Sequence, residues 1–303
     1  MVTLRIATRG SELALWQARH VASLLTAVDP DLEVELVVVR TTGDQRLDTP
    51  IWELGGKGVF VAEVRTAVLD GRADLAVHSA KDLPAVPIDG LEIAAVPDRA
   101  DPRDALVGGS LAELVPGALV ATGSVRRRAQ LAWARPDLRF CGVRGNIATR
   151  LDHVGSDGID AVVVAVAALD RLGLSDRIAE VLDPSVMLPQ VGQGALAVEC
   201  GEGASDRLRS TLTAIEHQPT RMAVDAERGF LAELGGDCDL PAGAYALAAA
   251  EGVRVTGLLA SPDGHVVLRH VDNGNDPAAT GRGVARYLLD EAGGASLLAG
   301  RSD

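Results

Sequence analysis

The sequence is organised around the segment from Thr122 to Arg150, TGSVRRRAQLAWARPDLRFCGVRGNIATR. This segment contains seven arginines and a single acidic residue, Asp137, although the whole chain carries a formal net charge of −13. Guanidinium groups stay charged when they lose water, and they form planar, paired hydrogen bonds with carboxylate or phosphate. A local excess of arginine in an acidic protein therefore predicts a binding site for an anion.

Two places in this segment have the pattern of a strand that runs into a helix. Residues 123–124 precede Arg126 and Arg127, and residues 145–146 precede Arg150. The positive end of the helix dipole favours acids in a first turn, so arginines there cost stability unless an anion binds beside them. For any one arginine the alternative is a solvated helix face. Two such junctions in one segment favour a binding cleft.

Outward from this segment, strand-like runs alternate with helical patterns, which predicts largely parallel sheets with helical crossovers. A polar, proline-flanked linker at 97–102 and a second crossover before residue 195 predict two lobes. The expected strands lie at 3–8, 33–40, 74–78, 104–108, 118–121, 138–143, 160–165 and 195–200, and the helices begin near Ser11, Val59, Ser124 and Gly145.

The pattern changes near Ile215 to that of a small α+β domain with an antiparallel three-stranded sheet. It comprises a long helix at 220–234, strands at 244–250, 253–260 and 265–271, and a helix at 277–292. The predicted domains are therefore lobe 1 (1–98 plus 194–214), an arginine-rich lobe 2 (102–190) and a C-terminal domain (217–303).

Sequence composition argues against several classes of protein and of ligand. Residues 4–7 are too short and too charged for the core of a signal peptide, and the longest apolar run, 161–169, cannot span a membrane. Three cysteines without a CxxC pair are typical of a reduced, cytoplasmic protein. We also expect a monomer. Six scattered histidines argue against a metal site, and a pI near 4.9 argues against nucleic acid.

Two lysines stand out because the other 27 basic residues are arginine. Lys57 lies among three glycines, Gly55, Gly56 and Gly58. This composition predicts a mobile loop that closes over a ligand, and an ordinary surface turn is the alternative. Lys81 and Asp82 follow the strand at 74–78, and ligands bind at the carboxyl ends of strands in open α/β sheets. These two residues are therefore candidates for contact with a ligand.

Cys238 lies in the loop LGGDCDLP between the long helix and the first strand of the C-terminal domain. The two flanking aspartates disfavour the thiolate, because like charges repel. The loop therefore suits a thiol that reacts once and then carries a group better than a nucleophile of fast turnover. A harmless exposed thiol is the alternative. Cys141 and Cys200 lie in apolar runs and are expected to be inert.

Nine motifs occur in a fixed order over nearly the whole chain. They are RIATRGSELALWQA, GGKGVFVAEV, ADLAVHSAKDLP, DPRDAL, TGSVRRRAQL, VRGNIATRL, AVAALDRLGL, LPQVGQGALAVEC and GGDCDLPAGAYA. Together they resemble the porphobilinogen deaminase (hydroxymethylbilane synthase) family. The resemblance implies an α/β fold with two lobes like those of type II periplasmic binding proteins, plus the small C-terminal domain.

The resemblance also implies a transferase with a dipyrromethane cofactor, joined to Cys238 through a thioether. Such an enzyme adds four porphobilinogen units to this primer, releases ammonia at each step and hydrolyses off hydroxymethylbilane. Each unit brings an acetate and a propionate, which accounts for the arginines. The implied partner is the small-molecule substrate, with no nucleic acid, membrane or metal.

By the matched motifs, the implied catalytic residues are Asp82 and Lys81. The implied cofactor-binding residues are Cys238, Asp82, Lys81, Ser124, Arg126, Arg127, Arg144, Arg150 and Gly145. The implied substrate-binding residues are Arg9, Ser11, Arg144, Arg150, Arg171 and Gln193. The implied lid loop contains Lys57, Gly55, Gly56 and Gly58.

The sequence departs from the family pattern at Gly123, where many relatives have serine, and at Glu53 near the lid loop. Asp237 and Asp239 also replace the commoner neighbours of the cysteine, so we expect slower cofactor attachment. A non-catalytic two-lobed anion-binding protein is the alternative function. It accounts for the lobes and arginines, but not for Cys238 or the Lys81–Asp82 pair. A nucleic-acid-binding regulator would require a basic chain.

Overall fold

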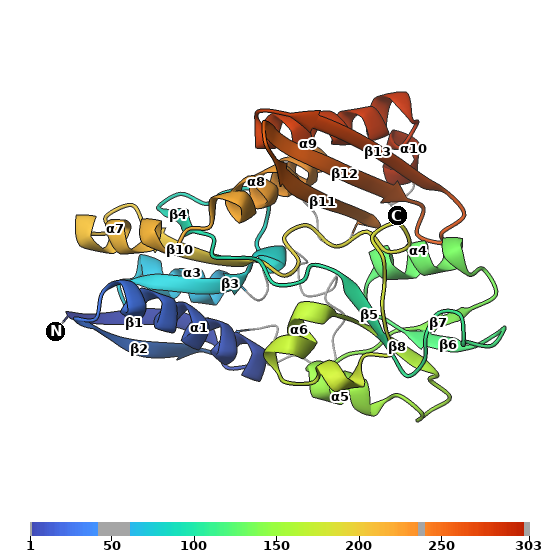
Figure 1. The fold of residues 1–303 in the computed structure, drawn as a ribbon, viewed down its shortest axis with the longest axis horizontal. Coiled ribbons are helices and arrows are strands. Elements are labelled where there is room, and N and C mark those ends of the chain that lie inside the picture. The colour runs from blue at the N-terminus through green and yellow to red at the C-terminus, as the bar shows by residue number, and fades with distance from the viewer. Residues whose placement is uncertain (1, 42–60, 236–239, 300–303) are drawn as a thin grey trace. The chain divides into compact units, whose positions relative to one another are not determined.

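The computed structural model describes residues 2–41, 61–235 and 240–299. The chain divides into two compact units, and it passes between them more than once along the sequence. The first unit comprises residues 1–100 and 195–221, and the second comprises residues 101–194 and 222–303. Figure 1 shows the elements of both units, coloured along the chain.

The first unit is built on a five-stranded sheet in the order β2-β1-β3-β10-β4. β1 pairs in parallel with β2 and β3, and β10 runs antiparallel to β3 and β4. The elements are β1 (Val2–Arg9), α1 (Glu12–Val28), β2 (Leu32–Val39), α3 (Ala62–Leu69), β3 (Leu75–Ser79), the 3-10 turn η2 (Ala80–Asp82), β4 (Leu91–Ala95), β10 (Leu196–Gly201) and α7 (Asp206–Ala214).

Side-chain alternation along β1 divides the core of this unit into two layers, because successive residues of a strand face opposite sides of the sheet. Ile6 packs in one cluster with Val21 of α1 and Leu212 of α7. Its neighbour Ala7 packs in the other cluster with Val64 of α3. Helices thus cover both faces of the sheet.

The second unit contains a five-stranded sheet in the order β7-β6-β8-β5-β9. β6 pairs in parallel with β7 and β8, whereas β5 runs antiparallel to β8 and β9. This topology repeats that of the first unit, with β5 in the place of β10. The elements are β5 (Asp104–Val107), β6 (Leu119–Ala121), α4 (Val125–Ala134), β7 (Arg139–Cys141), α5 (Ile147–Asp152), β8 (Ala161–Ala165), α6 (Val166–Arg171), η3 (Ser175–Arg177) and β9 (Glu180–Val181).

A separate antiparallel sheet, β11-β12-β13, completes the second unit. A Cβ atom added at Gly257 of β12 would lie 2.5 Å from Val284 and 2.6 Å from Phe230, so this glycine lets two helices pack closely on the sheet. The elements are α8 (Gln218–Glu233), β11 (Ala242–Ala249), β12 (Gly252–Ala260), β13 (Val267–Gly274), α9 (Pro277–Arg286), the π-helical turn η4 (Tyr287–Glu291) and α10 (Ala295–Ala299).

These sheets confirm the predicted fold class, α/β with a separate three-stranded antiparallel sheet. The expectation of largely parallel sheets is wrong at β10 and β5, which run antiparallel to their neighbours. Each of these strands follows a passage of the chain from one unit to the other, instead of a local helical crossover. The sequence patterns also missed β4, β9, α6, α7 and α10, and the last predicted helix is α-helical only as far as Arg286.

Candidate functional site

The carboxyl ends of β1 and β3 carry the predicted site residues of the first unit. Arg9 ends β1, and Ser11 caps α1 by accepting a hydrogen bond from the backbone N–H of Ala14. Lys81 and Asp82 form the 3-10 turn directly after β3 and are both half-buried. Because β1 and β3 are parallel neighbours, their carboxyl ends meet at one edge of the sheet. The structure therefore brings these four predicted residues to the same edge.

A buried glutamine, Gln17, stabilises this edge of the sheet. Its Nε2 donates to Oγ of Ser79, at 2.8 Å, and Ser79 is the last residue of β3. The bond joins α1 to the point at which the chain turns into Lys81 and Asp82. The sequence analysis did not single out Gln17, whose polar side chain at an apolar helix position was the available signal.

The first arginine junction of the second unit is the start of α4. Ser124 is the N-cap, and its Oγ accepts from the backbone N–H of Arg127 at 3.4 Å. Arg126 and Arg127 lie in the first turn, as predicted, and both side chains are buried, with exposed fractions of 2% and 7%. Their position requires a buried anion, because two unpaired guanidinium groups in this environment would be very unfavourable.

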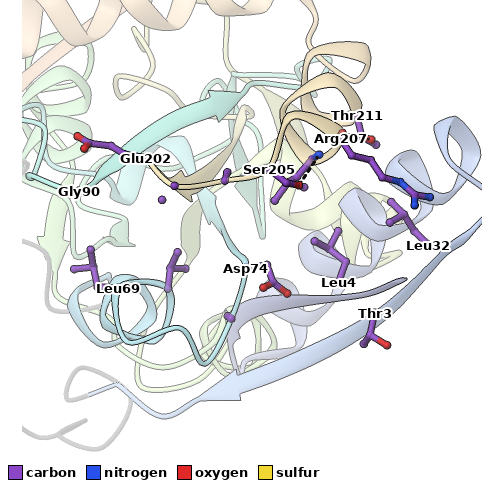
Figure 2. A pocket seen from close by; sticks show the side chains of 16 residues that line it. Thr3, Leu4, Leu32, Leu69, Asp74, Gly90, Glu202, Ser205, Arg207 and Thr211 are labelled. Atoms are coloured by element: carbon purple, nitrogen blue, oxygen red, sulfur yellow. Dashed lines mark hydrogen bonds between the residues drawn. The ribbon is translucent and has the colours of Figure 1, made fainter. Parts of the chain in front are cut away.

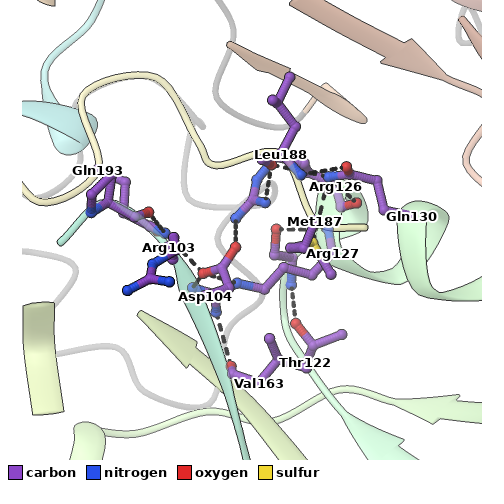
Figure 3. Close-up of polar contacts among 12 residues, drawn as sticks. Arg103, Asp104, Thr122, Arg126, Arg127, Gln130, Val163, Met187, Leu188 and Gln193 are labelled. Carbon is purple, nitrogen blue, oxygen red and sulfur yellow. Dashed lines mark hydrogen bonds and ion pairs between the residues drawn. The ribbon is translucent and has the colours of Figure 1, made fainter. Parts of the chain in front are cut away.

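Asp104, the first residue of β5, is this anion, and it is fully buried (Figure 3). Arg127 donates to Asp104 Oδ1 from Nη2 at 2.7 Å and from Nε at 3.1 Å. Arg126 Nη2 lies 2.9 Å from Oδ2. Gln193 Nε2 donates to Oδ1 at 2.9 Å. Asp104 lies in the motif DPRDAL and was not predicted as a site residue. An acid at the start of an otherwise apolar strand was the only signal.

The charge of Asp104 depends on its two arginines. Burial on its own would raise the pKa of this carboxyl, but the charges of Arg126 and Arg127 and the hydrogen bonds from Gln193 and Arg127 lower the pKa to about 2. The pKa of Arg126 is lowered in turn, because its burial outweighs the attraction of Asp104. The cluster is therefore ionised at neutral pH.

This depressed pKa predicts an acid-dependent loss of stability. The folded pKa of Asp104 lies below the ordinary value of 3.8, so its ionisation stabilises the protein above about pH 4. This contribution, about 2 kcal/mol, is lost as the pH falls from about 4 to about 2. Urea unfolding at pH 6, 4 and 3 measures it. The free energy of unfolding should depend less steeply on pH in Asp104→Asn, and an unchanged slope would contradict the assignment.

The second arginine junction lies between β7 and α5. Asn146 caps α5, and its Oδ1 accepts from the backbone N–H of Thr149 at 2.9 Å. Gly145 has a φ of +100°, and a Cβ atom there would lie 2.9 Å from Thr149 Cγ2, so the position requires glycine. Arg150 Nε donates to the carbonyl of Gly145 at 2.9 Å. The helix was expected to begin near Gly145, and its N-cap is one residue later.

Two more predicted residues of the second unit lie beside the chain segment that leads into β10. Arg171, the last residue of α6, donates from Nη2 to the carbonyl of Gly194 at 2.7 Å. Its burial lowers the pKa of the guanidinium to about 10. Gln193 also donates to the carbonyl of Pro102 at 2.7 Å. Gln193 thus joins the two segments at which the chain enters and leaves the second unit.

Arg144 is half-buried in the loop between β7 and α5. Cys238 and the predicted lid loop of Lys57, Gly55, Gly56 and Gly58 lie outside the described residues.

Comparison with known proteins identifies the family. The family model described as "Porphobilinogen deaminase, dipyromethane cofactor binding domain" matches residues 4–209, and the model of the family's C-terminal domain matches residues 222–290. A porphobilinogen deaminase of Syntrophomonas wolfei is 45% identical over 302 residues, which are 98% of each chain. One of Chromobacterium violaceum is 46% identical over 97% of this chain and 96% of its own. The chain belongs to the porphobilinogen deaminase family.

The family predicted from the nine motifs is thereby confirmed, and so is its dipyrromethane cofactor. The roles of individual residues stay predictions. Among solved structures, the chain is similar to the methionine-binding protein MetQ, with a TM-score of 0.43 and 14% identity over 72% of this chain and 92% of that one. It is also similar to DctP7, a solute receptor of Bordetella pertussis that binds pyroglutamic acid, with a TM-score of 0.39 and 13% identity over 71% and 77% of the two chains.

A cavity of the first unit lies away from the predicted site. It has a volume of about 530 Å³ and lies at the amino end of β3, whereas Lys81 and Asp82 follow the carboxyl end (Figure 2). Two of its charged lining residues, Asp74 and Arg207, are paired within the chain, with Arg5 and Asp29. No group of three or more potential metal ligands occurs among the described residues. The described helices also include none that is long and apolar enough to cross a membrane.

Proposed function

We propose that this chain is a hydroxymethylbilane synthase. It condenses four porphobilinogen molecules head to tail on a dipyrromethane primer bound to Cys238, releases ammonia at each step and hydrolyses the product to hydroxymethylbilane. The observation that carries the proposal is the set of guanidinium groups at two strand–helix junctions of a chain of net charge −13. Membership of the porphobilinogen deaminase family names the polycarboxylate ligand that such a set would hold.

The donors of the second unit fit the cofactor. Arg126 is almost fully buried, and its Nε has no hydrogen-bond acceptor among the described residues. A buried guanidinium with an unsatisfied donor fits a ligand carboxylate. The bound dipyrromethane supplies the free pyrrole carbon to which each new unit is added. Ser124, Arg127, Arg144, Gly145 and Arg150 are the other cofactor-binding residues that we propose in this unit.

Asp82 and Lys81 are the catalytic pair in this proposal. Loss of ammonia from porphobilinogen leaves a cationic azafulvene, and the Asp82 carboxylate stabilises this developing charge. At about 4 Å and an effective dielectric constant near 20, the attraction is worth roughly 4 kcal/mol. Asp82 also moves protons between the pyrrole nitrogen and the leaving amine. Lys81 binds a ligand carboxylate beside it.

In this proposal the remaining positive groups and their neighbours bind the carboxylates of the substrate. We assign this role to Arg9 and Ser11 in the first unit and to Arg144, Arg150, Arg171 and Gln193 in the second. Lys57 and its flanking glycines form the lid. We further propose a cytoplasmic monomer with three domains, in which the C-terminal domain at 217–303 carries the attachment cysteine.

The intact mass of the purified protein, measured for the wild type and for Cys238→Ser, tests this function. We expect the wild type to exceed its sequence mass by two linked pyrrole units, and we expect the variant to lack this excess and all activity. An unmodified wild type after expression with ample porphobilinogen would instead support the non-catalytic anion-binding protein.

A further inference from the structure

The cluster of Asp104, Arg126 and Arg127 carries a net positive charge inside the protein. Both guanidinium groups pair with the same carboxylate, and all three side chains are at least nine-tenths buried. Among the described residues, Asp104 is the one acid within ion-pair distance of either arginine. The surrounding contacts come from uncharged groups: Gln130, Gln193 and the carbonyls of Val163 and Leu188. The cluster therefore has a charge of +1.

The two arginines of the cluster are not equivalent. Arg127 uses all three of its nitrogens, because Nε and Nη2 donate to Asp104 and Nη1 donates to the carbonyl of Val163 at 2.9 Å (Figure 3). Arg126 donates from Nη1 to the carbonyl of Leu188 at 2.7 Å. Its Nη2 forms an ion pair with Oδ2 of Asp104 at 2.9 Å, and its Nε has no hydrogen-bond acceptor in the described part of the chain. The buried donor without an acceptor, Nε, thus belongs to Arg126 and not to Arg127.

The strand that follows the cofactor-attachment cysteine runs beside Arg126. β11 begins at Ala242, four residues after Cys238. A Cβ atom at Gly243 would lie 3.2 Å from Arg126 Cδ and 2.7 Å from the carbonyl oxygen of Pro189. Five residues of extended chain span at most about 18 Å. The chain is therefore short enough for a group carried by Cys238 to reach Arg126.

From this asymmetry we propose that Asp104 is a positioning residue that sets the charge of the cluster at +1, so that the cluster binds one ligand carboxylate and no more. Arg126 receives this carboxylate. Arg127 acts through Asp104 and holds it in place. The inference rests on the proposed function only for the identity of the anion, a carboxylate of the bound dipyrromethane.

The test compares the effect of Asp104→Asn on thermal stability with and without cofactor. The four proteins are the wild type and Asp104→Asn, each with Cys238 intact, and the same pair with Cys238→Ser, which cannot attach cofactor. Intact mass establishes the cofactor content of each sample. The cost of burying a net charge grows with the square of that charge. Loss of Asp104 raises the charge from +1 to +2 without cofactor and from 0 to +1 with it.

We therefore expect Asp104→Asn to lower the Tm of the Cys238→Ser protein by on the order of 10 °C. In the cofactor-bearing protein the loss should be roughly one third as large. A purely structural role of Asp104 would give equal losses in the two backgrounds. Equal losses, or a larger loss in the cofactor-bearing protein, would overturn the proposal.

If Asp104→Asn does not fold, substitutions of Arg126 and Arg127 test the charge of the cluster instead. In the Cys238→Ser background, Arg126→Gln removes the excess charge and leaves Oδ1 of Asp104 hydrogen-bonded to Arg127 and Gln193. Its Tm should stay within a few degrees of the parent. Arg127→Gln removes two hydrogen bonds to Asp104 and should lower the Tm by on the order of 5–10 °C. A larger loss of Tm in Arg126→Gln than in Arg127→Gln would overturn the roles assigned to the two arginines.

The outcomes separate this inference from the proposed function. A wild type without the two-pyrrole mass would contradict the function, and the Arg126 and Arg127 variants would still test the charge assignment in the protein without cofactor. A wild type with the mass, combined with equal losses of Tm in the two backgrounds, would contradict the inference alone.

Discussion

Replacing Asp82 with asparagine is expected to lower kcat by about 10²–10⁴-fold, the usual range for loss of a positioned acid–base group. The amide keeps the size of the side chain but cannot neutralise a cationic intermediate or carry a proton. Asp82 is half-buried in the turn after β3, a position that shields its charge from water only in part. We therefore expect the enzyme to fold normally. Measured rates of porphobilinogen consumption and of ammonia release should fall together.

Asp89→Asn is the matched control for this substitution. Asp89 lies in an exposed part of the same unit, after the turn that holds Asp82. The same change of chemistry there should alter kcat by less than twofold. An Asp82→Asn enzyme with cofactor attached and kcat within tenfold of the wild type would show that the carboxylate does not stabilise the reacting group.

The sequence predicted the elements whose periodicity is strong. β1, α1 and β2 have clear patterns of apolar residues, and α8 differs from its prediction by two residues at its start. β9 has only two residues, too few for any period to be visible. β4 and α7 lie in segments whose apolar residues depend on contacts with distant parts of the chain, such as the cluster around Ile6. Local patterns carry no information on these contacts.

The sequence patterns also could not predict the direction of β5 and β10 in their sheets. Each is an apolar strand, and a fully buried strand reads as a continuous apolar run in parallel and antiparallel sheets alike. Their antiparallel pairing follows from the path of the chain between the two units. Nothing in a single strand records this path.

The candidate site was predictable in its residue types and less so in its internal pairing. The sequence placed Arg126 and Arg127 in a first turn and inferred an anion beside them. In the structure this anion is the chain's own Asp104, which is 22 residues earlier in the sequence than Arg126 and belongs to strand β5, whereas Arg126 belongs to helix α4. The charge excess of the segment was visible, but the partner was not, because only the fold brings β5 to the start of α4.

The largest effect on stability is expected at Glu199, which lies in β10 and is 3% exposed. Its carboxylate accepts hydrogen bonds from Arg65 of α3, Nη2 to Oε1 at 2.6 Å and Nε to Oε2 at 2.8 Å, and lies 3.3 Å from Nε2 of His78. Burial would raise the pKa of Glu199, but the hydrogen bonds from His78 and Arg65 lower it to about 2. Glu199→Gln leaves the Arg65 charge uncompensated and should destabilise the protein by about 3–5 kcal/mol.

Urea unfolding of Glu199→Gln and of a surface control measures this effect. Glu233→Gln removes the acid of an exposed pair with Arg286 and should cost less than about 1 kcal/mol. The double variant Arg65→Met, Glu199→Leu removes both buried charges, so it should recover most of the loss. Recovery would show that the unpaired Arg65 charge, not the lost contacts of Glu199, causes the destabilisation. A double variant as unstable as Glu199→Gln would instead show that this ion pair is needed to hold α3 against β10.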